Sequence, residues 1–134
     1  MWQKSHLLVK EVYELTKVFP KDELLGLTSQ MRRAAISIPS NIAEGCGRQH
    51  TAGTLSFLFI ARGSLYELET QLYLATDLSY LPTEELQDCQ LLLNDCKKLL
   101  QGFIRYYRQS HELSRASEPL APYLTDNGQL PTDN

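Results

Sequence analysis

The chain has 134 residues, enough for one domain, and is 43% hydrophobic and 22% charged. This composition is that of a globular protein and excludes wholesale disorder. A formal net charge of −3 excludes a protein whose whole surface is built to bind nucleic acid, but it allows a local basic patch. The longest near-apolar run, residues 55–61, is too short to cross a bilayer. Three cysteines, an odd number, predict no disulfide framework, and we therefore expect a reducing, cytoplasmic location.

Two helices are predicted in the first third of the chain. The first covers about residues 3–19, and Pro20 ends it because the residue before a proline avoids the helical conformation. The second covers about residues 27–44, and a kink is expected where Pro39 removes the hydrogen-bond donor of the Ala35 carbonyl. Gly45 and Gly47 are expected to end this helix in the left-handed conformation. Their apolar stripes, at steps of three and four, are Leu8, Val12, Leu15 and Phe19, then Met31, Ala35, Ile38 and Ile42.

Two longer helices follow. The third is predicted over about residues 51–78 with Thr51 as N-cap, and the fourth runs from the N-cap Thr83 to about residue 109. Their stripes are Leu58, Ala61, Leu65, Leu68, Leu72 and Ala75, then Leu86, Cys89, Leu93, Cys96, Leu100, Phe103 and Tyr107. The pattern predicts an all-α protein: an antiparallel up-down-up-down four-helix bundle over residues 1–109. Residues 110–134, rich in proline and acids, are predicted to form a loose tail.

The third helix carries a second stripe, beside the first. It consists of aromatic residues at seven-residue steps, and they are Phe59, Tyr66, Tyr73 and Tyr80. One interpretation is that they broaden the core and leave the tyrosine hydroxyls in water; the other is that they bury against another copy of the chain. Gly63 lies in the same helix, where glycine is about 1 kcal/mol less favourable than alanine. We predict that it permits close approach of a neighbouring backbone, with the Pro39 kink as candidate partner.

No catalytic or metal-binding pattern is present among the polar residues. The three histidines and three cysteines lack the spacings HExxH, CxxC and ExxH, and no phosphate-binding glycine loop or serine elbow occurs. Cys89 and Cys96 fall on the core stripe and are predicted to be buried small hydrophobic residues. We therefore expect no enzyme, no metal and no cofactor, and a metal-dependent enzyme is a weaker hypothesis than a nucleic-acid-binding protein or a scaffold.

Arginines form the one chemical feature that suggests a ligand. Four of them lie in residues 26–66 against the single acid Glu44, and they are Arg32, Arg33, Arg48 and Arg62. Arginine grips phosphate through two parallel hydrogen bonds and stacks on bases, so these residues are candidates for binding nucleic acid. The alternative is that Arg32 and Arg33 neutralise Glu44, Glu67 or Glu69 in structural ion pairs. In a symmetric oligomer, weak patches of this kind would add through avidity.

Two long motifs carry a family resemblance. Residues 27–48, LTSQMRRAAISIPSNIAEGCGR, and residues 60–72, IARGSLYELETQL, resemble the two signatures of a bacterial four-helix-bundle family. Its members are named after reading frames in the intervening sequences of 23S rRNA genes, and are also labelled S23 ribosomal protein. Phe19-Pro20 resembles the family's first helix stop, so the resemblance covers about residues 2–107.

The resemblance implies a protein without established enzymatic activity. The family's similarity to the accessory protein of diversity-generating retroelements implies five-fold ring oligomers and, in that relative, a basic surface that binds RNA or DNA. The chain departs from the family at Thr51-Ala-Gly-Thr54, where Ser-x-x-Glu is common, and in its acidic tail, which could compete with nucleic acid for the arginines. The sequence therefore predicts a non-enzymatic homo-oligomer, a pentamer by resemblance, that binds structured RNA or DNA. The alternative is a structural or protein-binding scaffold with no nucleic-acid role.

Overall fold

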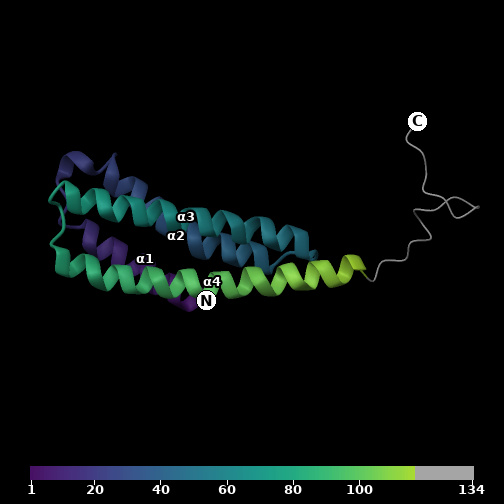
Figure 1. Cartoon of the computed structure of the whole chain (residues 1–134). Helices are drawn as coiled ribbons and strands as arrows, with labels where there is room; N and C mark the ends of the chain where they lie inside the picture. The colour runs from purple at the N-terminus through teal and green to yellow at the C-terminus, as the bar shows by residue number, and fades with distance from the viewer. Residues whose placement is uncertain (117–134) are drawn as a thin grey trace, which may run out of the picture.

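The computed structural model describes residues 1–116, which form four α-helices (Figure 1). They are α1 (Trp2–Thr16), α2 (Leu27–Cys46), α3 (Thr51–Asp77) and α4 (Thr83–Ala116), with a short 3₁₀ helix η1 (Lys21–Glu23) between α1 and α2. Over these residues there is no β-strand. The all-α prediction is confirmed.

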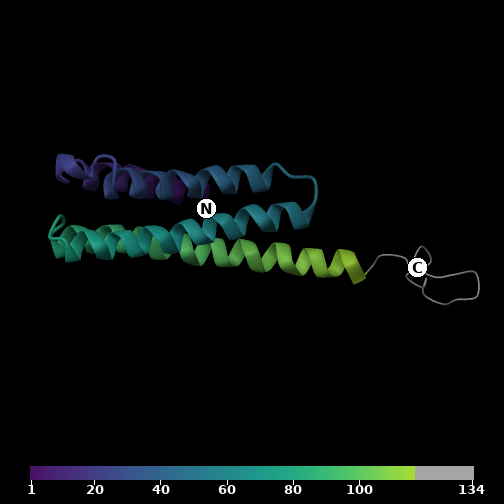
Figure 2. The ribbon, with the colours of Figure 1, turned by 90° about the horizontal axis from the view of Figure 1, so that it is seen from above.

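Within this part of the chain each helix packs against the next, and α1 closes the ring by packing against α4. In the diagonal pairs, α1 with α3 and α2 with α4, no two α-carbons lie within 8 Å of each other. Two views at right angles show that the helix axes are aligned along one direction, with the N-terminus midway along the molecule (Figures 1 and 2). This is the antiparallel bundle that the sequence predicts.

The core confirms the predicted apolar stripes of the first three helices, all of whose members are buried. The stripe of α4 shifts at its C-terminal end, where Ile104 is buried and Phe103 is 37% exposed. The reason is the short α1: Lys4 Nζ pairs with Asp95 at 3.6 Å, which places the first turn of α1 beside the middle of α4. Beyond that point α4 has only α3 to pack against, so its core face narrows.

Several helix ends differ from the prediction. Helix α1 stops at Thr16, whose hydroxyl donates to the Val12 carbonyl at 2.8 Å, while Phe19 is buried three residues later. The N-cap of α3 is His50 rather than Thr51. Gly47 ends α2 in the right-handed conformation, with φ of −83°, so the predicted left-handed cap is wrong. The left-handed cap is at the end of α3 instead, where Ser79 has φ of 63°.

Helix α4 continues to Ala116, seven residues past the predicted boundary at residue 109. The polar composition after Gln109 predicts a tail, but residues 110–116 contain neither proline nor glycine and are helical. The rest of the predicted tail, residues 117–134, lies outside the described residues. Helix α2 continues through the buried Pro39, and the kink there stays a prediction.

The prediction for Gly63 is wrong within the chain. A β-carbon at Gly63 would meet no other atom within 4 Å, so no neighbouring backbone approaches it. The close approach occurs at Gly45, where a β-carbon would lie 3.1 Å from Phe57 Cβ and 3.2 Å from the Thr54 carbonyl oxygen. The Thr54 hydroxyl also donates to the Gly45 carbonyl at 2.8 Å. Gly45 is therefore the residue that lets α2 and α3 meet.

The predicted aromatic stripe divides into two kinds of residue, and its last member, Tyr80, lies three residues past the end of α3. Phe59 packs against the core, and Tyr80 packs on Phe19 and donates to Glu23 at 3.3 Å, so contacts inside the chain account for both. Tyr66 and Tyr73 are 47% and 53% exposed. A role for the stripe between copies of the chain stays a prediction.

Candidate nucleic-acid interface

Arg32 lies between α1 and α2. Its Nε donates to Thr16 Oγ1 at 2.9 Å, and its guanidinium lies over the Tyr13 ring, 4.6 Å from the centroid. The side chain is half-buried by these contacts. Arg32 therefore joins two helices, and part of its hydrogen-bonding capacity is already used.

Arg33 faces the other side of α2. It lines a cavity of about 400 Å³ between α2 and α3, together with Gln30, Ala34, Ser37, Ser64 and Glu67. The hydroxyls of Ser37 and Ser64 share a hydrogen bond of 2.8 Å across this cavity, and Asn41 Nδ2 donates to Ser37 Oγ at 2.9 Å. The hydrogen bond between Ser37 and Ser64 therefore joins α2 to α3, and Asn41 holds Ser37 from within α2.

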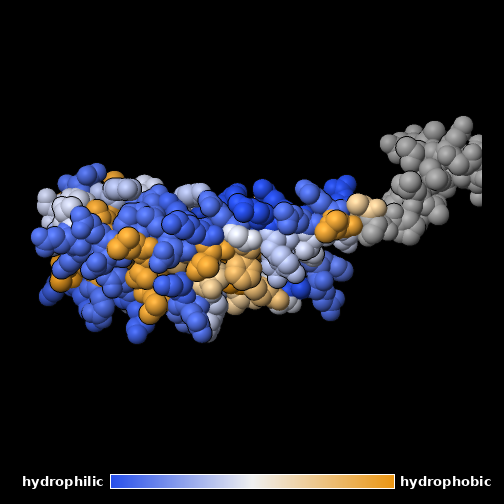
Figure 3. Space-filling model, turned by 60° about the horizontal axis from the view of Figure 1, so that its bottom comes forward, coloured by the Kyte–Doolittle hydropathy of each residue, from blue (hydrophilic) through white to orange (hydrophobic). Residues whose placement is uncertain are grey.

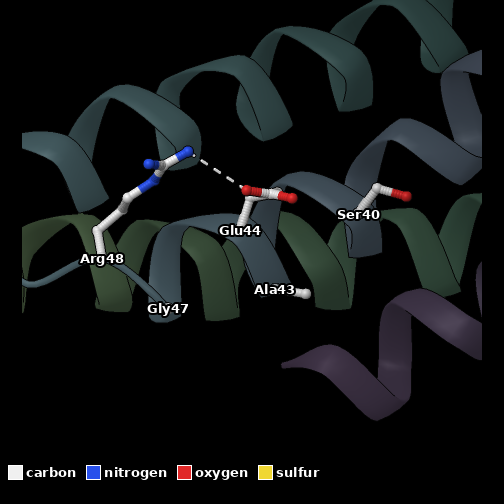
Figure 4. Close-up of a pocket in the computed structure, with 5 residues that line it drawn as sticks. All are labelled: Ser40, Ala43, Glu44, Gly47 and Arg48. Carbon is white, nitrogen blue, oxygen red and sulfur yellow. Dashed lines mark hydrogen bonds and ion pairs between the residues drawn. The ribbon is translucent and has the colours of Figure 1, made fainter.

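Arg48 lies just past the end of α2 (Figure 4). One of its terminal nitrogens binds Glu44 Oε2 at 3.3 Å, and its guanidinium lies 4.6 Å from the centroid of the Phe57 ring. Side chains of both partners are at least half exposed, so the pair contributes little to stability. The open cavity beside it, about 610 Å³, is lined by Ser40, Ala43, Glu44, Gly47 and Arg48.

Arg62 belongs to a cluster that extends onto α4. Arg62, Arg105 and Arg108 line one cavity of about 430 Å³ between α3 and α4, and Glu112 is the carboxylate among its lining residues. The guanidinium groups of Arg62 and Arg108 lie 4.9 Å and 5.2 Å from the centroid of the Phe59 ring. Among residues 1–116 these three arginines form no ion pair. We call Arg62, Arg105 and Arg108 the arginine cluster.

Arg105 and Arg108 are the residues that the sequence interpretation missed. The charge imbalance in the sequence was assigned to residues 26–66, and the two arginines lie on another helix, α4. A signal was available, because Arg105 and Arg108 are three apart and therefore share a helix face. Antiparallel packing of α3 on α4 then brings that face to Arg62.

The alternative of structural ion pairs is wrong for Arg32 and Arg33, which form none among residues 1–116. Glu69 instead accepts hydrogen bonds from Lys97 at 2.6 Å and from Gln90 at 2.9 Å. The hydrogen bond from Lys97 lowers the pKa of Glu69, and the hydrogen bond from Gln90 and the charge of Lys97 add to this, whereas burial opposes it. Among residues 1–116, Arg32 and Arg33 are therefore charged groups without an ion-pair partner.

Charge is segregated along the length of the described bundle. The end where α2 stops and α3 begins carries five arginines against two glutamates; the arginines are Arg48, Arg62, Arg105, Arg108 and Arg115, and the glutamates are Glu44 and Glu112. The opposite end carries eight carboxylates, Glu14, Asp22, Glu23, Glu67, Asp77, Glu84, Glu85 and Asp88, against Lys17, Lys21, Arg32 and Arg33. The first of these ends, which we call the basic end, attracts anions.

The thiols are placed as predicted. Cys89 and Cys96 are buried in the core, and burial raises the pKa of Cys89 to about 12 and that of Cys96 to about 11. Cys46 is exposed. In the part of the chain that the structure describes, no three His, Cys, Asp or Glu residues gather as a metal site, and no helix has the length and apolarity to span a membrane.

Both the fold and the sequence are similar to those of known proteins. A crystal structure of a protein of unknown function from the S23 ribosomal protein family of Bacteroides thetaiotaomicron is 25% identical and superposes with a TM-score of 0.72. The alignment covers 78% of this chain and 94% of that one. No curated protein matches. The sequence model of the 23S rRNA-intervening sequence proteins matches residues 1–102, which include α1, α2, α3 and most of α4, and the chain therefore belongs to this family.

Proposed function

We propose that this protein is a non-enzymatic nucleic-acid-binding protein that acts as a homo-oligomer and binds through its basic end. The observation that carries the proposal is the arginine cluster. Three guanidinium groups from two helices line one cavity, and none of them pairs with a carboxylate among residues 1–116. Clustered like charges repel, and a phosphate anion bound between them relieves the repulsion.

The geometry of arginine favours phosphate over a diffuse cloud of counterions. Each guanidinium offers parallel N–H donors that match two phosphate oxygens. Stacking on Phe59 holds Arg62 and Arg108 in place, so less side-chain entropy is lost when an anion binds. The cluster is thus partly preorganised for the phosphate backbone of a nucleic acid.

Association of copies is the second part of the proposal. Helix α4 exposes apolar side chains beyond the reach of α1, and Leu99, Phe103 and Tyr106 are 39%, 37% and 63% exposed. With Lys98 and Gly102 they line an apolar cavity of about 330 Å³. Figure 3 shows hydrophobic residues gathered near the middle of one face of the molecule. A contiguous patch of this kind is suited to burial against another chain.

Oligomerisation would make the basic end effective. Three arginines in one chain give weak binding, but several copies on one nucleic acid add through effective concentration. The family resemblance suggests five copies. The competing hypothesis is a scaffold that binds only protein. It uses the same apolar face of α4, and in it the arginines bind no ligand.

The experiment that separates the two is binding of a fluorescent RNA hairpin with a single-stranded flank, followed by anisotropy at low and at physiological salt. The proposal expects binding that weakens steeply with salt. The variant with Arg62, Arg105 and Arg108 all replaced by Gln loses most of the binding, whereas Lys17→Gln, at the opposite end of the bundle and paired with Glu14, loses little. No binding at low salt by the unmodified protein would support the scaffold. Light scattering on the same samples gives the number of copies.

A further inference from the structure

The seam between α3 and α4, which we call the α3–α4 groove, carries the cavity of the arginine cluster and, next to it, an exposed aromatic ring. Tyr66 lies one helical turn from Arg62 on α3, so the two side chains are neighbours on that helix. Lys97 of α4 lies across from it, with Nζ 5.1 Å from the centroid of the Tyr66 ring. The tyrosine nevertheless remains 47% exposed. Cationic and aromatic groups therefore follow one another along a single groove.

The arginine part of the groove suits a phosphodiester. The cavity of about 430 Å³ is lined by all three members of the arginine cluster and also by Gln101 and Gln109, which can donate further hydrogen bonds. Its carboxylate, Glu112, lies at the outer end of α4, away from Tyr66. A phosphate in this cavity would be held from two helices and adjacent to the tyrosine.

The aromatic part suits an unpaired base. Base stacking on tyrosine needs a free face of the base, which the bases of a duplex do not offer because they stack on each other. Alternation of cations with a stacking ring is the arrangement by which proteins hold single strands. A duplex, by contrast, would reach the arginines but leave Tyr66 without a partner.

From this juxtaposition we propose that the α3–α4 groove binds a single-stranded segment of nucleic acid. The arginine cluster holds its phosphates, and an unpaired base stacks on Tyr66. This inference rests on the proposed nucleic-acid binding and names the kind of nucleic acid that the groove takes. It assigns Tyr66 to the ligand rather than to a second copy of the chain.

The same helix supplies a matched control. Tyr73 lies seven residues from Tyr66 on the same stripe and is exposed to a similar degree, 53%. Unlike Tyr66, it has no arginine one turn away on α3, and its neighbours at that spacing include Asp77, whose carboxylate repels a phosphate backbone. A base should therefore stack on Tyr66 and not on Tyr73.

The experiment measures anisotropy of a fluorescein-labelled oligouridylate, alone and in its duplex with oligoadenylate, against the full-length protein. We expect the single strand to bind about tenfold more tightly than the duplex, Tyr66→Leu to lose about tenfold in affinity for the strand, and Tyr66→Phe to retain it. Tyr73→Leu should change the affinity less than twofold. Unfolding curves and light scattering check that each variant keeps the fold and mass of the unmodified protein.

Four results would overturn the inference. Equal affinity for strand and duplex would leave the proposed function standing and remove the single-strand groove. Equal losses for Tyr66→Leu and Tyr73→Leu would show that tyrosine stacking is not localised at the groove. A change in mass caused by Tyr66→Leu would place this tyrosine between copies of the chain. Failure of the hairpin, the strand and the duplex to bind would reject the inference together with the proposed function.

Discussion

Lys97 Nζ on α4 donates to Glu69 Oε2 on α3 at 2.6 Å, in an ion pair whose side chains are only 21% and 23% exposed. The pair crosses the α3–α4 interface beside Tyr66, whose ring Lys97 also contacts. It thus fixes the position of one edge of the groove. A hydrogen-bonded pair with this little exposure is screened less by water and salt than a surface pair.

Replacing Glu69 by Gln should destabilise the protein at neutral pH by about 1–2 kcal/mol, because Lys97 is left half-buried without its counter-charge. The pKa of Glu69 is lowered from the ordinary 4.5 in the folded state, so its contribution is present above pH 4.5 and is lost as the pH falls through the lower folded value. Urea unfolding of both proteins at several pH values should show their stabilities converging on the acid side.

The exposed pair of Glu14 with Lys17 provides the control for that experiment. Its side chains are 67% and 61% exposed, and the hydrogen bond lies within one turn rather than between helices. Glu14→Gln should leave the unfolding midpoint unchanged within error. If Glu14→Gln lowers the free energy of unfolding as much as Glu69→Gln does, then partial burial between α3 and α4 does not strengthen the Glu69–Lys97 pair.

Gly63→Ala and Gly45→Ala should shift stability in opposite directions. Gly63 is helical and has open space around it, so alanine should stabilise the protein by about 1 kcal/mol through helix propensity. At Gly45 the added methyl group would press on Phe57 and the Thr54 backbone, and we expect a loss of about 1–3 kcal/mol. Thermal unfolding measures both. Destabilisation by Gly63→Ala, together with a change in oligomer mass, would show that another copy approaches that glycine.

Ser79→Gly should stabilise the cap of α3. Ser79 has φ of 63°, where a side chain is about 1 kcal/mol less favourable than glycine. The backbone bonds that need this conformation are in place, with the Ser79 and Tyr80 amides donating to Thr76 and Ala75 at 2.9 Å. Glycine should therefore raise the unfolding midpoint, and Ser79→Ala should not. Equal midpoints for the glycine and alanine variants would contradict a strained cap.

The fold could be predicted from the sequence because periodicity directly reports burial in a bundle. Residues such as Leu58, Leu65 and Leu72 recur at helical steps, and the structure buries all three. Phe103 and Ile104 exchange roles because α1 is too short to cover the end of α4, and the apolar stripe of α4 alone does not contain the length of its neighbour. The local apolar pattern predicts where the helices lie, whereas the relative lengths of the packed helices decide which side chains are buried at their ends.

The candidate site could be predicted only in part. Residues 26–66 contain four candidate arginines, of which one, Arg62, joins a cluster, while Arg32 faces α1 and Arg33 faces α3. Arg105 and Arg108 were missed because a window along the sequence cannot contain charges that only packing between helices brings together. The same limit applies to the two glycines. The sequence shows that both Gly45 and Gly63 lie in or near predicted helices, but only the packing shows that a neighbouring helix approaches Gly45 and not Gly63.

The salt dependence of oligouridylate binding tests the central claim most directly. Each phosphate contact to a single strand contributes roughly 0.7 to the slope of log affinity against log salt concentration. If the arginine cluster binds phosphates, the protein with all three arginines replaced by Gln should show a slope smaller in magnitude by about 2 than the unmodified protein. Equal slopes for the two proteins, with the helical fold intact in both, would contradict the claim.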